Sequence, residues 1–308
     1  MPALPMEWLL SVPALAVLGL LVGSFLNVVA HRFPLMLERQ WWSDVATQLG
    51  DEESHHRVLG QAMPEATRQV AVSLQTQLDA LSPLGLSRPA SRCPSCGQAI
   101  RWHQNVPFIS WLVLRGRCAC CAQSISVRYP VVEVATAVLF AAVGWRFGPT
   151  PMALWYCGLV GALLALSLID WDTTVLPDDI TLPLLWAGLA GAALGAGVAL
   201  ADSIWGAVAG YLSLWSVYWL FKLATGKEGM GHGDFKLLAA LGAWLGWQAL
   251  LPVILAASVL GALVGIGMKV TGSLREGRYV PFGPFLAGAG IVILLLGNAV
   301  VLRWMGWA

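Results

Sequence analysis

MALWYCGLVGALLALSLID, residues 152–170, is an apolar run whose only carboxylate, Asp170, stands at its end. A helix needs roughly 20 apolar residues to cross the hydrocarbon core of a bilayer. Further apolar runs occupy 8–30, 130–147, 179–199, 203–222, 235–248, 251–269 and 282–302. The pattern predicts an all-α polytopic membrane protein with about eight transmembrane helices.

Composition agrees with this class. Over 308 residues, 57% are hydrophobic and 11% are charged, whereas soluble domains carry about 25% charged residues. The net charge is +1, and the basic residues are not concentrated in one patch. We therefore expect the lipid bilayer, and no nucleic acid, as a partner. Seven spans is the main competing count, because the run 235–248 is short and only Gly246-Trp247-Gln248 and Pro252 separate it from the next.

The distribution of Lys and Arg predicts the orientation, since these residues concentrate in cytoplasmic loops. Eight spans place all 18 basic residues except Arg146 and Arg303 on one side, so we expect both termini to lie outside. Seven spans would move Lys269, Arg275 and Arg278 to the opposite side. No Lys or Arg precedes the first apolar run, which therefore indicates a retained helix and not a cleaved signal.

Three parts follow from this topology: a first transmembrane helix over 1–30, a cytoplasmic domain over 31–129, and a core of about seven helices over 130–308. Within the polar domain, the stretch 37–91 is rich in Gln, Ser, Asp and Glu. An amphipathic helix is predicted over 66–81 from Val70, Leu74 and Leu78.

Two CxxC pairs lie in the cytoplasmic domain, Cys93 with Cys96 and Cys118 with Cys121. Each short turn presents two sulfurs, and four such thiolates match a tetrahedral structural zinc site of the ribbon type. Disulfides or unliganded thiols are the alternatives, although a reducing cytoplasm disfavours disulfides. Cys120 is a spare thiol that could replace a neighbour, but the CxxC register favours the other four.

A second carboxylate, Asp234, follows Gly231-His232-Gly233 just before another apolar run. Ionisable groups at the edge of a bilayer core are costly and usually mark functional sites. The predicted topology brings Asp170 and Asp234 to the same cytoplasmic face. A pair of carboxylates there favours acid/base chemistry.

Other charged residues lie close to this pair in the sequence. Asp172 and Asp179 are interpreted as solvated loop acids. Asp178 follows Pro177 at the start of a predicted helix, where a helix N-cap role is as well supported as a catalytic one. Lys236 either pairs with an acid or extends to the interface.

Several motifs together resemble the type IV prepilin peptidases, bifunctional enzymes of the GxGD class of intramembrane aspartic proteases. The matching segments are Gly23-Ser-Phe-Leu-Asn-Val-Val-Ala-His-Arg-Phe-Pro34, the CxxC pairs around Ile100-Arg-Trp and Asn105-Val-Pro-Phe-Ile-Ser-Trp111, Arg128-Tyr-Pro-Val-Val-Glu133, Ile169-Asp170 through Leu176-Pro-Asp178, Gly231-His-Gly-Asp-Phe-Lys236 and Pro281-Phe-Gly-Pro-Phe-Leu286. The resemblance places the catalytic aspartates at Asp170 and Asp234, an active-site loop at Gly231, Gly233, Lys236 and Asp178, and the metal-binding thiols at Cys93, Cys96, Cys118 and Cys121.

The resemblance also implies the reaction and its location. Prepilins or type II secretion pseudopilins would lose a basic leader after Gly at the cytoplasmic face of a bacterial inner membrane. The new N-terminal residue would then be methylated from S-adenosylmethionine, and both termini of the enzyme would be periplasmic. Two carboxylates in one site do not both ionise easily, so one would stay protonated while the other activates water. Which aspartate starts as base is left open by the sequence.

Two other classes of function remain as alternatives. A transporter or channel would use membrane acids to relay protons or bind cations, and it predicts broken-helix repeats; the sequence has no convincing internal repeat. A purely structural membrane component with a docking zinc unit leaves Asp170 and Asp234 unexplained.

Overall fold

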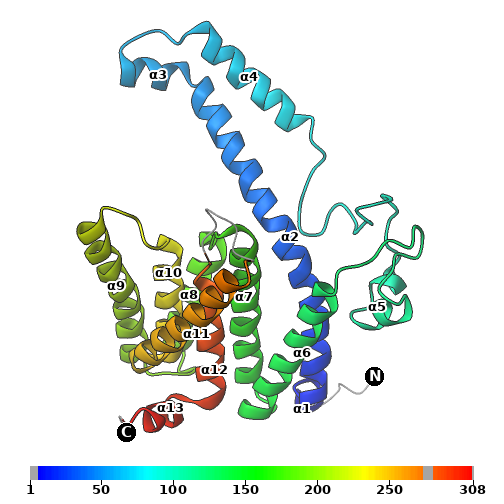
Figure 1. The fold of residues 1–308 in the computed structure, drawn as a ribbon, viewed down its shortest axis with the longest axis vertical. Coiled ribbons are helices and arrows are strands. Elements are labelled where there is room, and N and C mark those ends of the chain that lie inside the picture. Colours follow the sequence, from blue (N-terminus) through cyan, green and yellow to red (C-terminus); the bar gives the residue numbers. More distant parts are fainter. Residues whose placement is uncertain (1–5, 273–279, 307–308) are drawn as a thin grey trace. The chain divides into compact units, whose positions relative to one another are not determined.

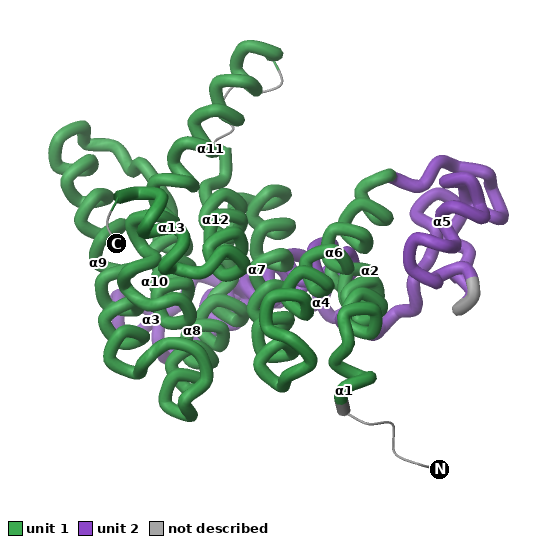
Figure 2. The backbone as a smooth tube through the Cα atoms, turned by 90° about the horizontal axis from the view of Figure 1, so that it is seen from below, with its two compact units in different colours: residues 1–26, 127–308 green, residues 27–126 purple. Residues whose placement is uncertain are grey.

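The computed structural model describes residues 6–272 and 280–306. The regular secondary structure of these residues is helical apart from two isolated β-bridges, and turns and loops connect the helices. The chain forms two compact units: one consists of Met1–Leu26 with Val127–Ala308, and the other of Asn27–Ser126 (Figures 1 and 2). The elements are α1 (Met6–Leu9), α2 (Val12–Gly50), α3 (Glu52–Leu59), α4 (Glu65–Asp79), η1 (Trp102–Asn105), α5 (Ile109–Val113), α6 (Arg128–Phe147), α7 (Pro151–Thr173), α8 (Asp178–Ala193), α9 (Leu200–Thr225), α10 (His232–Leu245), η2 (Trp247–Ala249), α11 (Leu250–Val270), α12 (Gly283–Leu296) and α13 (Asn298–Trp304).

Several helices are long and apolar enough to cross a membrane. Five stretches in the described residues meet both requirements, within α2, α6, α7, α9 and η2–α11, and a sixth does if α12 and α13, bent by 102°, form one span. This confirms the all-α polytopic class. Helices α8 and α10 have 16 and 14 residues, short for a full span, so the count of about eight stays a prediction. The cytoplasmic loop expected at 270–281, with Arg275 and Arg278, lies mostly outside the described residues.

The first apolar run belongs to a helix that extends well beyond it. Helix α2 continues from the run 8–30 through Pro34 to Gly50, into the stretch rich in Gln, Ser, Asp and Glu, where the residue pattern predicted no helix before residue 66. The amphipathic stretch expected over 66–81 is helical from 66 to 79, within α4. Both α3 and α4 belong to the smaller unit, Asn27–Ser126.

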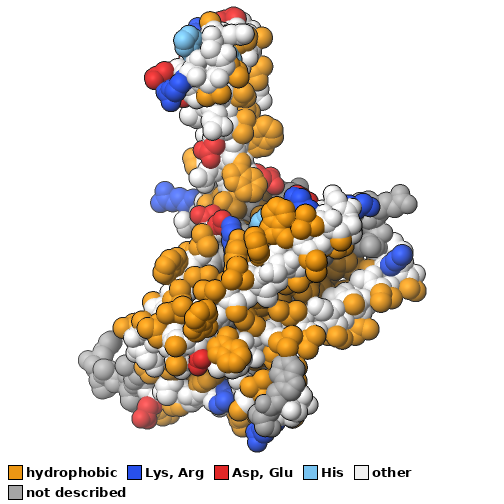
Figure 3. Space-filling view, turned by 90° about the vertical axis from the view of Figure 1, so that its left-hand side faces the viewer, with side chains coloured by type: hydrophobic (Ala, Val, Ile, Leu, Met, Phe, Trp, Pro, Cys, Tyr) orange, Lys and Arg blue, Asp and Glu red, His pale blue; other side chains and the backbone are white. Residues whose placement is uncertain are grey.

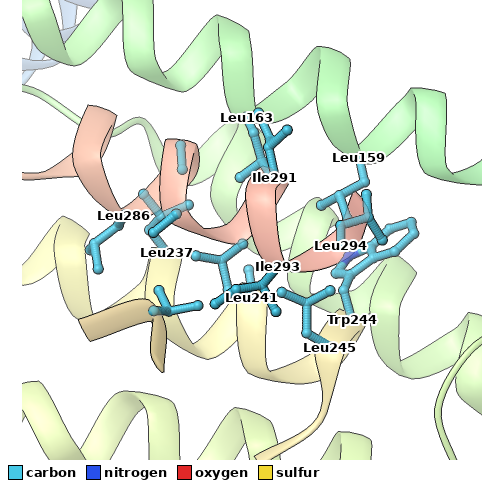
Figure 4. Close-up of a cluster of buried hydrophobic side chains, with 14 of the residues drawn as sticks. Leu159, Leu163, Leu237, Leu241, Trp244, Leu245, Leu286, Ile291, Ile293 and Leu294 are labelled. Carbon is cyan, nitrogen blue, oxygen red and sulfur yellow. The ribbon is translucent and has the colours of Figure 1, made fainter. Parts of the chain in front are cut away.

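Helix α10 lies at the centre of the larger unit. It packs against α8, α9 and α12, and nearly every residue from Asp234 to Leu245 is buried. A helix that is apolar on all sides is expected to lie inside a helical bundle. Figure 4 shows its side chains meeting those of α7 and α12; Leu163, Leu237 and Leu286 there are fully buried.

Small residues set the distance between α9 and α10. A Cβ added to Gly206 would lie 2.1 Å from the carbonyl oxygen of Gly242, and one on Gly210 would lie 2.6 Å from that of Leu238. Membrane helices commonly approach closely through such residues because no side chain separates their backbones. Close backbone packing at Leu238 and Gly242 therefore fixes α10, the helix that begins with Asp234 in its first turn, against α9.

The outer helices expose many large hydrophobic side chains. Trp205, Leu212 and Leu220 of α9 and Leu263 and Ile266 of α11 are between 48% and 72% exposed. Figure 3 shows hydrophobic side chains over much of one face of the molecule. Exposed apolar area on this scale indicates a lipid-facing surface.

Candidate aspartic site and tetracysteine centre

Asp170 lies in the last turn of α7 and is buried, with 5% of its surface exposed. Its Oδ2 accepts a hydrogen bond of 3.0 Å from the backbone N–H of Gly283, the first residue of α12. A Cβ on Gly283 would lie 2.6 Å from the same oxygen. Glycine therefore permits the close approach between this carboxyl group and the start of α12.

Asp234 lies in the first turn of α10 and is 7% exposed. Its Oδ1 has no hydrogen-bond partner among the described residues, and its carboxyl group interacts electrostatically with that of Asp170. The side chain of Leu176 lies beside both segments: a Cβ on Gly233 would be 2.7 Å from Leu176 Cβ, and one on Gly283 would be 3.2 Å from Leu176 Cδ1. The two carboxylates singled out in the sequence thus share one buried site.

An ion pair joins the starts of α8 and α10 beside this site. Lys236 Nζ lies 2.7 Å from both carboxylate oxygens of Asp178. The N-cap of α8 is Pro177, so Asp178 is the first helical residue and not the cap; an acid in the first turn is still favoured by the helix dipole. Gly231 is the N-cap of α10.

The structure places Asp172 in a helix, whereas the sequence was interpreted as placing it in a loop. It lies in the last turn of α7 and forms an ion pair of 2.7 Å with Arg128, the first residue of α6. The sequence around Asp172 contains no basic residue, and only the fold brings Arg128 to it. Asp179 is exposed in the first turn of α8, which agrees with a solvated acid.

A polar and aromatic cluster supports the loop before Asp234. Lys222 Nζ lies 2.9 Å from Glu228 Oε1 and 3.0 Å from the hydroxyl oxygen of Tyr218, whose O–H lies 3.2 Å from the same Glu228 oxygen. The ring of His232 packs against Tyr218 and Phe235 at centroid distances of 5.1 and 5.3 Å. Sequence reasoning missed this cluster because its members interact across the turn between α9 and α10.

The four predicted cysteines form one cluster in the smaller unit. The sulfur atoms of Cys93, Cys96, Cys118 and Cys121 all lie within 4.8 Å of one another, and the sulfurs of Cys93 and Cys121 are 3.8 Å apart. A tetrahedral Zn²⁺ with Zn–S bonds of about 2.3 Å separates its ligands by about 3.8 Å. The arrangement of the sulfurs therefore fits a zinc ion, and Cys120 is outside the cluster.

Both CxxC turns have the same backbone pattern. The N–H of Gly97 donates to the carbonyl of Cys93, and the N–H of Ala122 donates to that of Cys118. Gly97 and Ala122 have φ of +69° and +55°, a left-handed conformation that favours glycine. Each turn thus presents two sulfurs on one side.

Backbone donors also point at the sulfurs. The N–H groups of Cys96 and Ser95 lower the pKa of the Cys93 thiol from 9.0 to about 6. Those of Cys121 and Cys120 likewise lower the pKa of Cys118. Hydrogen bonds to sulfur favour the thiolate, which is the form that binds metal.

Comparisons with known proteins identify the family of the chain. The sequence profile described as Bacterial Peptidase A24 N-terminal domain matches residues 17–147, and the Type IV leader peptidase family matches 157–266. Relatives from several bacteria carry the name prepilin leader peptidase/N-methyltransferase. That of Pseudomonas putida is 51% identical and aligned over 92% of this chain and 90% of its own length; that of Stutzerimonas stutzeri is 47% identical over 99% of both; that of Pseudomonas aeruginosa is 47% identical over 94% and 92%.

No solved structure matches the chain. The two profiles together span the CxxC turns and the helices that carry both aspartates, and the similarity to full-length relatives extends over nearly all of the sequence. The chain belongs to the type IV leader peptidase family.

Proposed function

We propose that the chain cleaves the leader peptide from type IV prepilins and pseudopilins after Gly, with Asp170 and Asp234 as the catalytic pair, and then N-methylates the new N-terminal residue. The observation that carries the peptidase half is that α7 and α10 each contribute a buried carboxyl group and that these two groups interact electrostatically. Membership of the family and the names of the relatives support both halves.

The chemistry expected of such a pair is peptide hydrolysis through an activated water. One carboxylate takes a proton from the water, whose oxygen attacks the scissile carbonyl, while the other carboxyl group donates a proton to the carbonyl oxygen. Buried groups act strongly here because little water competes with them. Gly231, Gly233, Lys236 and Asp178 are proposed as the loop that positions Asp234.

We further propose that the site opens at the cytoplasmic face of a bacterial inner membrane, with both chain termini periplasmic. The basic leader of a prepilin would remain in the cytoplasm by the same charge rule that orients the enzyme. The cytoplasmic domain is proposed to span 31–129, between a first transmembrane helix over 1–30 and the catalytic core over 130–308.

Two bound groups belong to this proposal. Zinc would be held by Cys93, Cys96, Cys118 and Cys121 and would stabilise a region that has little hydrophobic core. S-adenosylmethionine would supply the methyl group. The methyl-transfer half rests on the names of the relatives, and no residue of this chain is assigned to donor binding.

Asp-to-Asn substitutions test the peptidase half. Membranes containing Asp170→Asn or Asp234→Asn should not process a prepilin, whereas Asp179→Asn, an exposed neighbour, should process it at the parental rate. Processing by either of the first two variants would contradict the catalytic pair. The second half needs its own assay: if the purified enzyme cleaves a prepilin but transfers no label from labelled S-adenosylmethionine, the methylation proposal is wrong.

A further inference from the structure

The two carboxyl groups of the proposed catalytic pair have different surroundings. Asp170 Oδ2 accepts the N–H of Gly283 at 3.0 Å. Asp234 Oδ1 is buried and has no partner among the described residues. The pair is therefore asymmetric before any substrate binds.

The donor to Asp170 comes from the start of a helix. Gly283 is the first residue of α12, a helix of 14 residues, and Pro284 follows it. The first N–H groups of a helix have no partner within the helix and carry partial positive charge. A carboxylate accepts such a hydrogen bond more strongly than a neutral acid does, so this contact favours the ionised form of Asp170.

The surroundings of Asp234 favour the neutral form. A buried charge without a hydrogen bond or a paired cation is costly. Lys236, two residues further along the chain, pairs with Asp178 through both carboxylate oxygens. The nearby ring of His232 packs against Tyr218 and Phe235. The described contacts thus give Asp234 Oδ1 neither a donor nor a cation.

We propose that Asp170 is the ionised base of the pair and Asp234 the protonated acid. Gly283 determines this assignment, because its N–H stabilises the ionised form of Asp170. The assignment rests on the proposed peptidase function and adds a positioning role for the start of α12. Gly283 acts through Asp170 and does not touch the reacting atoms.

The hydrolytic step then has a defined course. Asp170 removes a proton from water as the water oxygen bonds to the scissile carbonyl carbon, and Asp234 gives its proton to the carbonyl oxygen. The resulting diol then collapses. One of its hydroxyl groups returns a proton to Asp234, Asp170 gives its proton to the leaving nitrogen, and the C–N bond breaks. The products are the leader with a C-terminal carboxyl group and the pilin with a free amine.

Glycine is required at position 283 for the contact. A Cβ there would lie 2.6 Å from Oδ2 and 3.2 Å from the Asp170 carboxyl carbon, and it would also meet Leu176 Cδ1 at 3.2 Å. Alanine would therefore push the carboxylate away from the N–H. Gly288, on the same helix, has open space around an added Cβ and offers a matched control.

The test uses a prepilin peptide in which a hydroxyethylene group replaces the scissile bond after Gly. Its hydroxyl donates to the ionised carboxylate and accepts from the protonated acid. Asp234→Asn retains a neutral donor and should weaken binding to the purified full-length enzyme by less than about threefold, whereas Asp170→Asn removes the charged acceptor and should weaken it by about tenfold or more. The reverse order, or equal losses, overturns the assignment.

Two further measurements keep the test decisive. Gly283→Ala should weaken analogue binding in the parental and Asp234→Asn backgrounds but add little in Asp170→Asn, because it acts through Asp170; Gly288→Ala should change nothing. Additive losses from Gly283→Ala in all backgrounds would contradict the positioning role. Prepilin cleavage by Asp170→Asn or Asp234→Asn would instead overturn the peptidase proposal itself, a separate outcome.

Discussion

Lys236 Nζ lies 2.7 Å from both carboxylate oxygens of Asp178 and joins the first turn of α10 to the first turn of α8. The side chains are 29% and 52% exposed, so water screens the pair and its contribution to stability is at most about 1 kcal/mol. Asp234 lies in the same turn of α10 as Lys236. The pair therefore matters more for the position of Asp234 than for folding.

Lys236→Met should lower the rate of prepilin cleavage several-fold while changing the unfolding midpoint of the detergent-purified enzyme only slightly. The reason is that the first turn of α10 loses its ion pair with α8 and the carboxyl group of Asp234 becomes less well placed. Cleavage rate and thermal unfolding, measured on the same preparation, separate the two effects.

Asp178→Asn should reproduce this loss, and the double variant should cost little more than either single change, since both remove one interaction. Asp179→Asn is the matched control, because Asp179 is the exposed neighbour in the same turn. Strictly additive losses from Lys236→Met and Asp178→Asn would show that the ion pair does not position the site.

The cysteine cluster predicts a metal content. Purified full-length protein should contain about one zinc per chain, and Cys93→Ser or Cys118→Ser should abolish it, whereas Cys120→Ser should retain it because Cys120 is outside the cluster. Elemental analysis of the four proteins measures this directly. Retention of zinc in Cys93→Ser with loss in Cys120→Ser would contradict the ligand set.

The two CxxC turns give a separate prediction through their left-handed residues. Ala122→Gly should hold zinc as tightly or more tightly, because glycine relieves a conformation that costs a residue with a Cβ about 1 kcal/mol. Gly97→Ala should lose zinc to a chelator faster by the same argument. Chelator competition with a colorimetric zinc indicator compares the two, and faster loss from Ala122→Gly would contradict the shared backbone pattern.

The pH response of the loop before α10 follows from Glu228. Hydrogen bonds from Lys222 and then Tyr218 lower the pKa of Glu228 below its ordinary 4.5. A lowered pKa in the folded state gives stability that is present above the unfolded value and is lost as pH falls through the folded one. Parental protein should therefore unfold at a higher temperature than Glu228→Gln above pH 4.5, and the difference should disappear at lower pH. A difference that grows on acidification would contradict this sign.

The sequence was sufficient to predict the helical membrane class, and it singled out Asp170 and Asp234, the two aspartates that the structure buries. Long apolar runs have few other structural outcomes, and Asp170 and Asp234 are costly where they stand. The fold adds contacts between residues distant in the chain: Gly283 is 113 positions from Asp170, and Arg128 is 44 positions from Asp172. No local pattern specifies such pairs, since helix packing alone decides which residues meet.

Helix boundaries show a related limit. The run 235–248 is short for a membrane span, and in the structure α10 is enclosed by α8, α9 and α12. A buried helix and a short lipid-facing one have the same apolar composition, so the sequence did not distinguish them. The extension of α2 to Gly50 was missed because its second half is polar and contains Pro34.

The close contact between α9 and α10 yields the last prediction. Gly206→Ala should lower the free energy of unfolding by about 1–3 kcal/mol, because its Cβ would lie 2.1 Å from the carbonyl oxygen of Gly242 and the helices would have to separate. That separation would also move Asp234, so cleavage should fall together with stability. Gly158→Ala in α7 is the matched control, since nothing lies within 4 Å of its added Cβ. Denaturant unfolding in detergent with a parallel cleavage assay measures both, and equal behaviour of the two variants would show that the contact is not required for the α9–α10 interface.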